Sequence, residues 1–179
     1  MTTAQQARGV LFVHSSCTAV CPHVEWAASA VLGAPVSLQW SPQPAEAGTY
    51  RAELSWQAAP GTAGRLASAL RGWDRVRYEV TEDASPLVEG ARYCYTPALG
   101  IFHAMTSTHG DIVVPEDRIR AVLRGAGATL AIGGDGVGTG PTALFSALRD
   151  LLGAAWDEEL EPFRHAGDGA AVRWLHRVG

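Results

Sequence analysis

The chain has 179 residues, of which 47% are hydrophobic, and its formal net charge is −4. A chain of this length can bury a sizeable core without disulfides or metals. The composition excludes an intrinsically disordered protein, and the negative charge argues against nucleic-acid binding. The sequence contains 14 arginines and no lysine.

The cysteine content and the apolar runs indicate where the protein works. The odd number of cysteines, at Cys17, Cys21 and Cys94, argues against a disulfide framework. The chain shows no secretory leader, and its apolar runs are shorter than the roughly 20 residues that span a bilayer. We therefore expect a cytoplasmic protein with reduced thiols and no membrane contact.

The first half of the chain alternates between strand and helix patterns. The expected elements are a strand at residues 9–14, a helix from Pro22 to Gly33, strands at residues 36–40 and 50–57, a helix from Thr62 to Trp73, and a strand at residues 76–80. This order predicts a ferredoxin-like β-α-β-β-α-β sandwich over residues 1–85, within an α+β fold.

Several charged side chains are expected to face solvent. In the strand at residues 76–80, apolar residues alternate with Arg75, Arg77 and Glu79, which places these three on the face away from the helices. That face is either solvated or covered by the second half of the chain. The acidic residues of the segment 157–161 are likewise expected to form a solvated helix surface.

The second half is expected to form a β-hairpin and a helical extension. The expected elements are strands at residues 91–96 and 100–106, a helix from Pro115 to Gly125, a long helix from Thr142 through Trp156 that Pro162 ends or kinks, and a short strand at residues 171–175 that could rejoin a sheet. No linker separates the halves, so residues 86–179 are expected to form one compact body with residues 1–85.

A glycine-rich segment directly before the long helix is a candidate anion site. Glycines let backbone amides approach a ligand, and the start of a helix favours phosphate or carboxylate. The segment lacks the lysine of a P-loop and does not complete a dinucleotide fingerprint, so a plain glycine-rich connection is the competing interpretation. The candidate ligand-binding residues are Gly133, Gly134, Asp135, Gly136, Gly138, Thr139 and Thr142.

The first strand-to-helix turn gathers cysteine and histidine. Cys17, Cys21 and His23, with His14 before them, could supply a thiolate or a metal site. The C-x-x-x-C spacing differs from the redox C-x-x-C motif, and a structural zinc site needs a second ligand pair. Packing of small cysteine side chains is the alternative. No cofactor is expected.

Two histidines lie beside hydroxyl side chains near the end of the predicted hairpin. His103 and His109 flank Thr106, Ser107 and Thr108, so either histidine could act as a general acid or base. A catalytic triad depends on geometry in space, and the sequence contains no G-x-S-x-G nucleophile motif. A polar hairpin end is the competing interpretation.

Three stretches of the sequence resemble a known family. They read GVLFVHSS, CPHVEWA and RYCYTPALGIFHAMTSTHGD. The resemblance is to the actinobacterial domain-of-unknown-function 3145 family and extends over nearly the whole chain. It implies a bacterial cytoplasmic protein, some of whose relatives are encoded beside fatty-acid synthesis genes, and it transfers no catalytic residues.

Three functions follow from these features. The absence of a complete catalytic set favours a non-enzymatic binding or accessory protein, whose partner is another protein or a small anionic ligand. Acyl carrier protein or another fatty-acid synthesis component is the first partner to consider, because Arg65, Arg71, Arg75 and Arg77 could meet an acidic surface. The alternatives are an enzyme that holds a phosphate- or carboxylate-bearing metabolite at the glycine-rich loop, with His103 or His109 as acid or base, and a small Cys/His metal-binding module.

Overall fold

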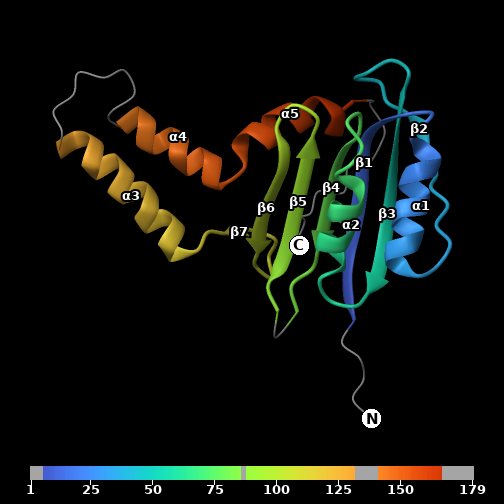
Figure 1. Cartoon of the computed structure of the whole chain (residues 1–179), viewed down its shortest axis with the longest axis horizontal. Helices are drawn as coiled ribbons and strands as arrows, with labels where there is room; N and C mark the ends of the chain where they lie inside the picture. The colour runs from blue at the N-terminus through green and yellow to red at the C-terminus, as the bar shows by residue number, and fades with distance from the viewer. Residues whose placement is uncertain (1–5, 86–87, 132–140, 167–179) are drawn as a thin grey trace, which may run out of the picture.

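The computed structural model describes residues 6–85, 88–131 and 141–166, and it has an α+β fold (Figure 1). Within these residues a seven-stranded sheet has the order β2-β3-β1-β4-β5-β6-β7, and every neighbouring pair is antiparallel. The strands are β1 (Ala7–Cys17), β2 (Ser41–Pro42), β3 (Thr49–Ala58), β4 (Arg77–Glu82), β5 (Gly90–Thr96), β6 (Gly100–Thr106) and β7 (Ile112–Val113). The helices are α1 (Cys21–Leu32), α2 (Thr62–Leu70), α3 (Glu116–Ala131), α4 (Pro141–Leu151) and α5 (Ala154–Arg164).

Strand β1 lies in the middle of the first half of the sheet. It pairs with β3 on one side and with β4 on the other, while β2 pairs with the far edge of β3. β1 and β2, which α1 connects, are therefore separated by β3, as a split β-α-β arrangement requires. The α+β class is confirmed, and the ferredoxin-like topology stays a prediction.

The main hydrophobic core lies between the sheet and the helices α1 and α2. Leu11, Val24, Leu66 and Tyr78 are fully buried there, and each comes from a different element. Helix α1 begins with Pro22 in its first turn and ends at Gly33, whose φ of 70° is the left-handed value that suits glycine. This agrees with the helix expected from the sequence.

The strand predicted at residues 36–40 is wrong, because only Ser41–Pro42 pairs with β3. The backbone amides of this stretch bond to side chains of α1 instead of to a neighbouring strand. The Val36 amide donates to Ser29 Oγ at 2.8 Å, and the Leu38 amide donates to Glu25 Oε1 at 2.8 Å. An apolar segment whose amides are satisfied in this way needs no sheet partner.

The second half of the chain continues the same sheet and adds helices. The predicted hairpin is present as β5 and β6, and β7 extends the sheet by one short strand. Helices α3 and α4 pack side by side and project beyond the β7 edge (Figure 1). α3 continues to Ala131 instead of ending at Gly125. In the part of the chain that the structure describes, no helix is long and apolar enough to cross a membrane.

The single long helix predicted from Thr142 through Trp156 is wrong, because the chain turns at Gly153 between α4 and α5. Gly153 has a φ of 74°, which side chains other than glycine rarely adopt. Pro162 does not end the helix, since α5 runs through it to Arg164. The predicted strand at residues 171–175 and the glycine-rich segment up to residue 140 lie outside the described residues.

The turn at Gly153 can be tested by adding a methyl group. We expect Gly153→Ala to lower the free energy of unfolding by about 1 kcal/mol for the left-handed backbone and by a further ~1–3 kcal/mol for overpacking. The overpacking arises because the new Cβ would lie 2.6 Å from the Phe102 ring of β6. Urea unfolding monitored by circular dichroism measures the sum of the backbone and overpacking losses in the free energy of unfolding.

Gly33→Ala is the matched control for this substitution. Gly33 has a similar φ of 70°, but an added Cβ meets nothing within 4 Å, so only the backbone term applies. Equal losses of stability in the two variants would contradict the close approach of Gly153 to β6.

Candidate functional site

The polar side chains of the sheet gather on the face opposite α1 and α2. Successive side chains of a strand point to opposite faces, so Tyr78 and Glu79 of β4 lie on different sides. The Tyr78 hydroxyl donates to the Ala67 carbonyl of α2 at 2.7 Å. Glu79 therefore lies on the other face, in register with Phe12 of β1 and Cys94 of β5.

Helix α5 covers part of this second face. Leu160 of α5 is fully buried in a small cluster with Cys94 and Phe102, and Trp156 packs against the same cluster. The Trp156 indole donates to the Gly100 carbonyl at 2.9 Å. The face that was expected to be solvated or covered by the second half is thus partly covered by one helix.

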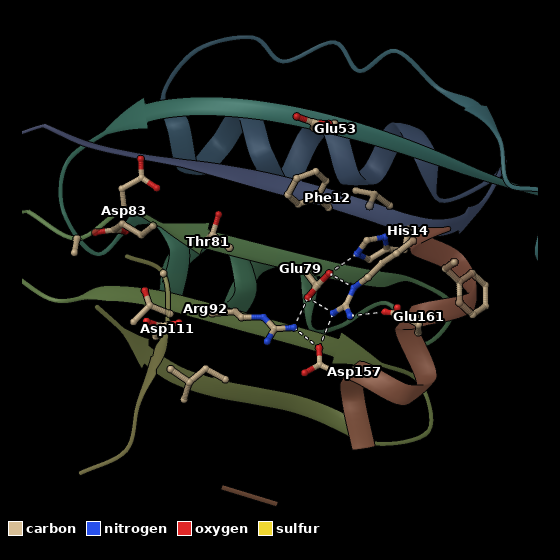
Figure 2. A pocket seen from close by; sticks show the side chains of 18 of the residues that line it. Phe12, His14, Glu53, Glu79, Thr81, Asp83, Arg92, Asp111, Asp157 and Glu161 are labelled. Atoms are coloured by element: carbon tan, nitrogen blue, oxygen red, sulfur yellow. Dashed lines mark hydrogen bonds and ion pairs between the residues drawn. The ribbon is translucent and has the colours of Figure 1, made fainter. Parts of the chain in front are cut away.

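Beside α5 the same face is hollowed into a cavity of about 1250 Å³, which we call the trough (Figure 2). Strands β3, β1, β4 and β5, residues 107–111 after β6, and α5 all contribute lining residues. Phe12 and Thr81 are among its lining residues. Its volume exceeds the roughly 300–1,000 Å³ of a typical small-molecule pocket, so it has room for several side chains of a peptide.

A buried carboxylate, Glu79, connects α5 to the sheet. It is 6% exposed. Its Oε1 accepts from Arg92 Nη2 at 2.7 Å and from Arg164 Nη2 at 2.5 Å. Its Oε2 accepts from Arg164 Nε at 3.0 Å and from His14 Nε2 at 2.7 Å. Figure 2 shows His14 of β1 and Arg92 of β5 pointing toward Glu79.

Asp157 completes this group, which we call the Glu79 cluster (Glu79, His14, Arg92, Arg164 and Asp157). Its Oδ1 accepts from Arg92 at 2.5 Å and from Arg164 at 2.8 Å. Two carboxylates thus face two guanidinium groups and one imidazole. Buried charges are tolerated when they are paired and hydrogen-bonded in this way.

The electrostatics of the Glu79 cluster keep Glu79 ionised. Burial by itself raises the pKa of Glu79. The hydrogen bond and charge of His14, followed by those of Arg164, lower this pKa by more than burial raises it. The resulting pKa lies well below the ordinary value of 4.5. Glu79 is therefore a permanent anion at neutral pH and cannot serve as a general acid there.

The thiol nearest this cluster is poorly suited to nucleophilic chemistry. Cys94 Sγ donates to Glu79 Oε1 at 3.4 Å. Burial raises the pKa of the Cys94 thiol well above 9.0, and the negative charge of Glu79 raises it further. Because the thiolate is the reactive form, Cys94 is expected to be inert at neutral pH.

A second ion group also holds α5 to the sheet. Arg77 donates to Glu159 at 3.3 Å and to Glu46 at 3.1 Å, and its guanidinium carbon lies 4.4 Å from the centre of the Phe163 ring. Thr96 Oγ1 donates to the other oxygen of Glu159 at 2.7 Å. The acidic segment expected to be solvated therefore supplies much of the contact between α5 and the sheet.

The arginines that line the trough are already engaged. Arg92 and Arg164 belong to the Glu79 cluster, and Arg51 Nη1 donates to the Ala166 carbonyl at 2.6 Å. A further anion in the trough would have to compete with these partners.

Three acidic side chains of the trough remain free. Glu53, Asp83 and Asp111 are exposed, and their carboxylates make no hydrogen bond or ion pair with any residue that the structure describes. Asp83 and Asp111 lie toward the opposite end of the trough from Glu161 (Figure 2). The open part of the trough is therefore acidic.

A protein-family model described as "Protein of unknown function (DUF3145)" matches residues 10–177. The chain belongs to the DUF3145 family. The match covers nearly the full length, as the resemblance in the sequence implied. No curated protein and no solved structure matches the chain.

The arginines expected to form a partner surface are divided between two faces. Arg65 of α2 and Arg71 and Arg75 after it are exposed. Arg77 points to the opposite face of the sheet from α2 and is paired with Glu46 and Glu159. The structure thus leaves three of the four available to a partner beside α2.

The other histidine and loop candidates are not brought together within the described residues. His103 stacks on Tyr93 with ring centres 4.4 Å apart, whereas His109 lines the trough. Tyr93 lies on the α2 side, because its hydroxyl is the atom nearest to an added Cβ at Gly64. Burial, and then the charge of Arg118, lower the pKa of His103. Of the candidate glycine-rich loop only Thr142, exposed near the start of α4, is described.

The predicted Cys/His constellation is separated by the fold. His14 belongs to the Glu79 cluster, while His23 stacks on Trp73 with ring centres 4.8 Å apart. Cys21 Sγ donates to the Cys17 carbonyl at 3.4 Å. Over residues 6–85, 88–131 and 141–166, no three His, Cys, Asp or Glu side chains are placed to hold a metal ion.

The residues that sequence reasoning missed are those of the Glu79 cluster and the free acids of the trough. Glu79 was expected on an exposed strand face and Asp157 on a solvated helix. Two features of the sequence together could have indicated the cluster. One is the charged face of the strand at residues 76–80, and the other is the segment 157–164, whose acidic residues and arginine could cover that face.

The Glu79 cluster predicts a large stability loss in Glu79→Gln. Among the described residues, removing this charge leaves Arg92 with Asp157 alone as a charged partner and leaves Arg164 with Asp157 and the exposed Glu161. Breaking a buried ion group costs about 3 kcal/mol. Urea unfolding at pH 7 measures the change. Glu53→Gln is the matched control, since Glu53 is exposed and has no partner among the described residues, and we expect a change within about 0.5 kcal/mol.

The same pair of proteins tests the ionisation of Glu79. The folded-state pKa of Glu79 lies below 4.5, so its stabilising contribution is complete above pH 4.5 and is lost as pH falls through the folded-state pKa. The difference in unfolding free energy between wild type and Glu79→Gln should therefore shrink as the pH is lowered below 4.5. A difference that stays constant down to pH 2 or so would contradict the account.

Proposed function

We propose that the protein is a non-enzymatic binding protein whose trough holds a positively charged ligand, such as an arginine-rich segment of a partner protein. The observation that carries the proposal is the distribution of free charge in the trough. The three lining arginines all donate to other residues of the chain, whereas Glu53, Asp83 and Asp111 make no hydrogen bond or ion pair within the part of the chain that the structure describes. We place this activity in the cytoplasm, which the free thiols of Cys17, Cys21 and Cys94 support.

The size and composition of the trough support a peptide-like ligand. At about 1250 Å³ the trough is larger than most small-molecule pockets. Phe12 and Leu152 supply apolar surface among the lining residues, and Phe12 is half-buried. An aromatic ring beside carboxylates suits a guanidinium group, which is planar and both stacks on rings and donates several hydrogen bonds.

The state of the ionisable groups argues against catalysis at this site. Glu79 stays ionised, and the pKa of the Cys94 thiol is well above 9.0. His14 is committed to Glu79 at 2.7 Å. The alternative acid–base mechanism needs either His103 or His109 beside a bound anion. His103 stacks on Tyr93 on the α2 side of the sheet, and His109 lines the trough, whose open part is acidic and disfavours an anionic substrate.

An acidic partner fits a different surface. Acyl carrier protein, or a small anionic ligand, would be repelled by the free carboxylates of the trough and would be better matched by Arg65, Arg71 and Arg75 beside α2. The sign of the charge on the ligand therefore separates the two binding interpretations.

A titration with tetra-arginine tests the proposed function. We expect this peptide to bind at low ionic strength and to bind more weakly as salt is added, because exposed charges are screened. Isothermal titration calorimetry would give the affinity. Tetra-glutamate, measured in the same way, should not bind in the trough.

Substitutions locate the binding. Asp83→Asn combined with Asp111→Asn should weaken tetra-arginine binding about tenfold, since two exposed ion pairs contribute about 1 kcal/mol each at most. Asp74→Asn combined with Asp117→Asn removes the same charge from exposed positions outside the trough and should change the affinity little. Equal weakening in the two double variants, or binding of tetra-glutamate alone, would overturn the proposal.

A further inference from the structure

The last described part of the chain is fixed at the rim of the trough. The Phe163 carbonyl accepts from Gln43 Nε2 at 3.2 Å, and the Ala166 carbonyl accepts from Arg51 Nη1 at 2.6 Å. Arg51 and Phe163 are themselves lining residues of the trough. Residues 167–179 therefore continue from a point next to the cavity.

The sequence of these residues complements the trough. Residues 167–179 contain Arg173 and Arg177 and one acidic residue, Asp168, which lies at the start of the segment before both arginines; they also contain Trp174 and Leu175. Thirteen residues can reach about 43 Å when extended, which is enough to cross a cavity of this size. The family match extends to residue 177, so most of this segment belongs to the matched region.

We propose that residues 167–179 dock into the trough of their own chain, with Arg173 and Arg177 facing the free carboxylates of Glu53, Asp83 and Asp111. The docked segment is an internal competitor of the positively charged ligand, so this inference rests on the proposed function. Trp174 and Leu175 place apolar surface against the half-buried Phe12. The occupant is thus a segment of the same molecule.

Attachment to the chain makes such competition effective. A segment tethered beside its site has an effective concentration on the order of 1 mM. If its intrinsic dissociation constant is about 0.1 mM, an external ligand binds roughly tenfold more weakly to the intact chain than to a chain whose segment cannot dock. Weak docking is sufficient for regulation of this kind.

A charge-reversed full-length variant tests the competition. We expect Arg173→Glu with Arg177→Glu to bind tetra-arginine about tenfold more tightly than wild type. Reversing two charges also makes the whole protein more acidic, which attracts the peptide without any specific site. Arg65→Glu with Arg71→Glu makes the same change of charge on α2 and directly after its end, away from the trough, and serves as the matched control.

A second readout does not depend on any ligand. In ¹⁵N relaxation measurements on the full chain, residues 169–178 of wild type should be as rigid as the sheet, and the Asp83→Asn/Asp111→Asn variant should release them. The Asp74→Asn/Asp117→Asn variant should leave them rigid. Because release of the segment also removes the internal competitor, the weakening of tetra-arginine binding by about tenfold is expected in full only in the Arg173→Glu/Arg177→Glu background, where no docked segment competes. A free segment in wild type, or equal tetra-arginine affinities for wild type and the Arg173→Glu/Arg177→Glu variant, would overturn the inference.

The two proposals fail in different ways. Release of residues 169–178 by the trough substitutions, with no binding of tetra-arginine to any variant, would support the docked segment and refute the proposed function. Tetra-arginine binding that depends on Asp83 and Asp111, with a free segment in wild type, would support the proposed function and refute the docked segment. Rigidity that disappears on dilution would show that the segment docks into a second copy and would overturn docking within one chain.

Discussion

The buried carboxylate of Glu79 is the interaction on which the second face of the sheet depends. It receives hydrogen bonds from His14 on β1, Arg92 on β5 and Arg164 on α5, and Asp157 balances the two arginines. A lone carboxylate with this burial would be strongly destabilising. Each partner therefore has to be in place together, and α5 is held to the sheet by charge as well as by Leu160 and Trp156.

The position of α5 accounts for the trough. The helix packs on Cys94 of β5 and Phe102 of β6 and also contacts β1, but it leaves β3 and parts of β1 and β4 open. The ion pairs that hold α5 on the sheet also engage Arg92 and Arg164, two of the arginines that line the trough. What remains for a ligand are the unpaired carboxylates, so one structural device determines both the shape of the cavity and the sign of the charge that it favours.

Local patterns were sufficient to predict several elements, because their signals lie within the elements themselves. The first helix has Pro22 and Gly33 at its ends, and β3 alternates polar and apolar residues over its whole length. The stretch at residues 36–40 has strand-like composition, yet Ser29 and Glu25 of α1 take its amide hydrogens, which no local pattern reveals. The break at Gly153 similarly depends on the approach of that glycine to Phe102.

The candidate site was harder to predict than the fold, since its members come from distant parts of the chain. Glu79 and Arg164 are 85 positions apart. Within its own strand or helix, each occupies a position where the sequence pattern predicts exposure to solvent. Arg77 was expected to face a partner protein, but it forms an ion pair with Glu159 of the same chain. Only the packing of α5 on the sheet turns these surface charges into a buried group, and packing between distant elements is not encoded in local periodicity.

The most direct test of the account is a map of where a positively charged ligand binds. Two-dimensional ¹H–¹⁵N spectra of the full chain, recorded during a titration with tetra-arginine, report the environment of each backbone amide. We expect the largest changes at Phe12, Glu53, Thr81, Asp83 and residues 107–111, with little change in α2 or in the α3–α4 pair. Changes centred on α2 or on α3 and α4, with the trough residues unaffected, would contradict the account.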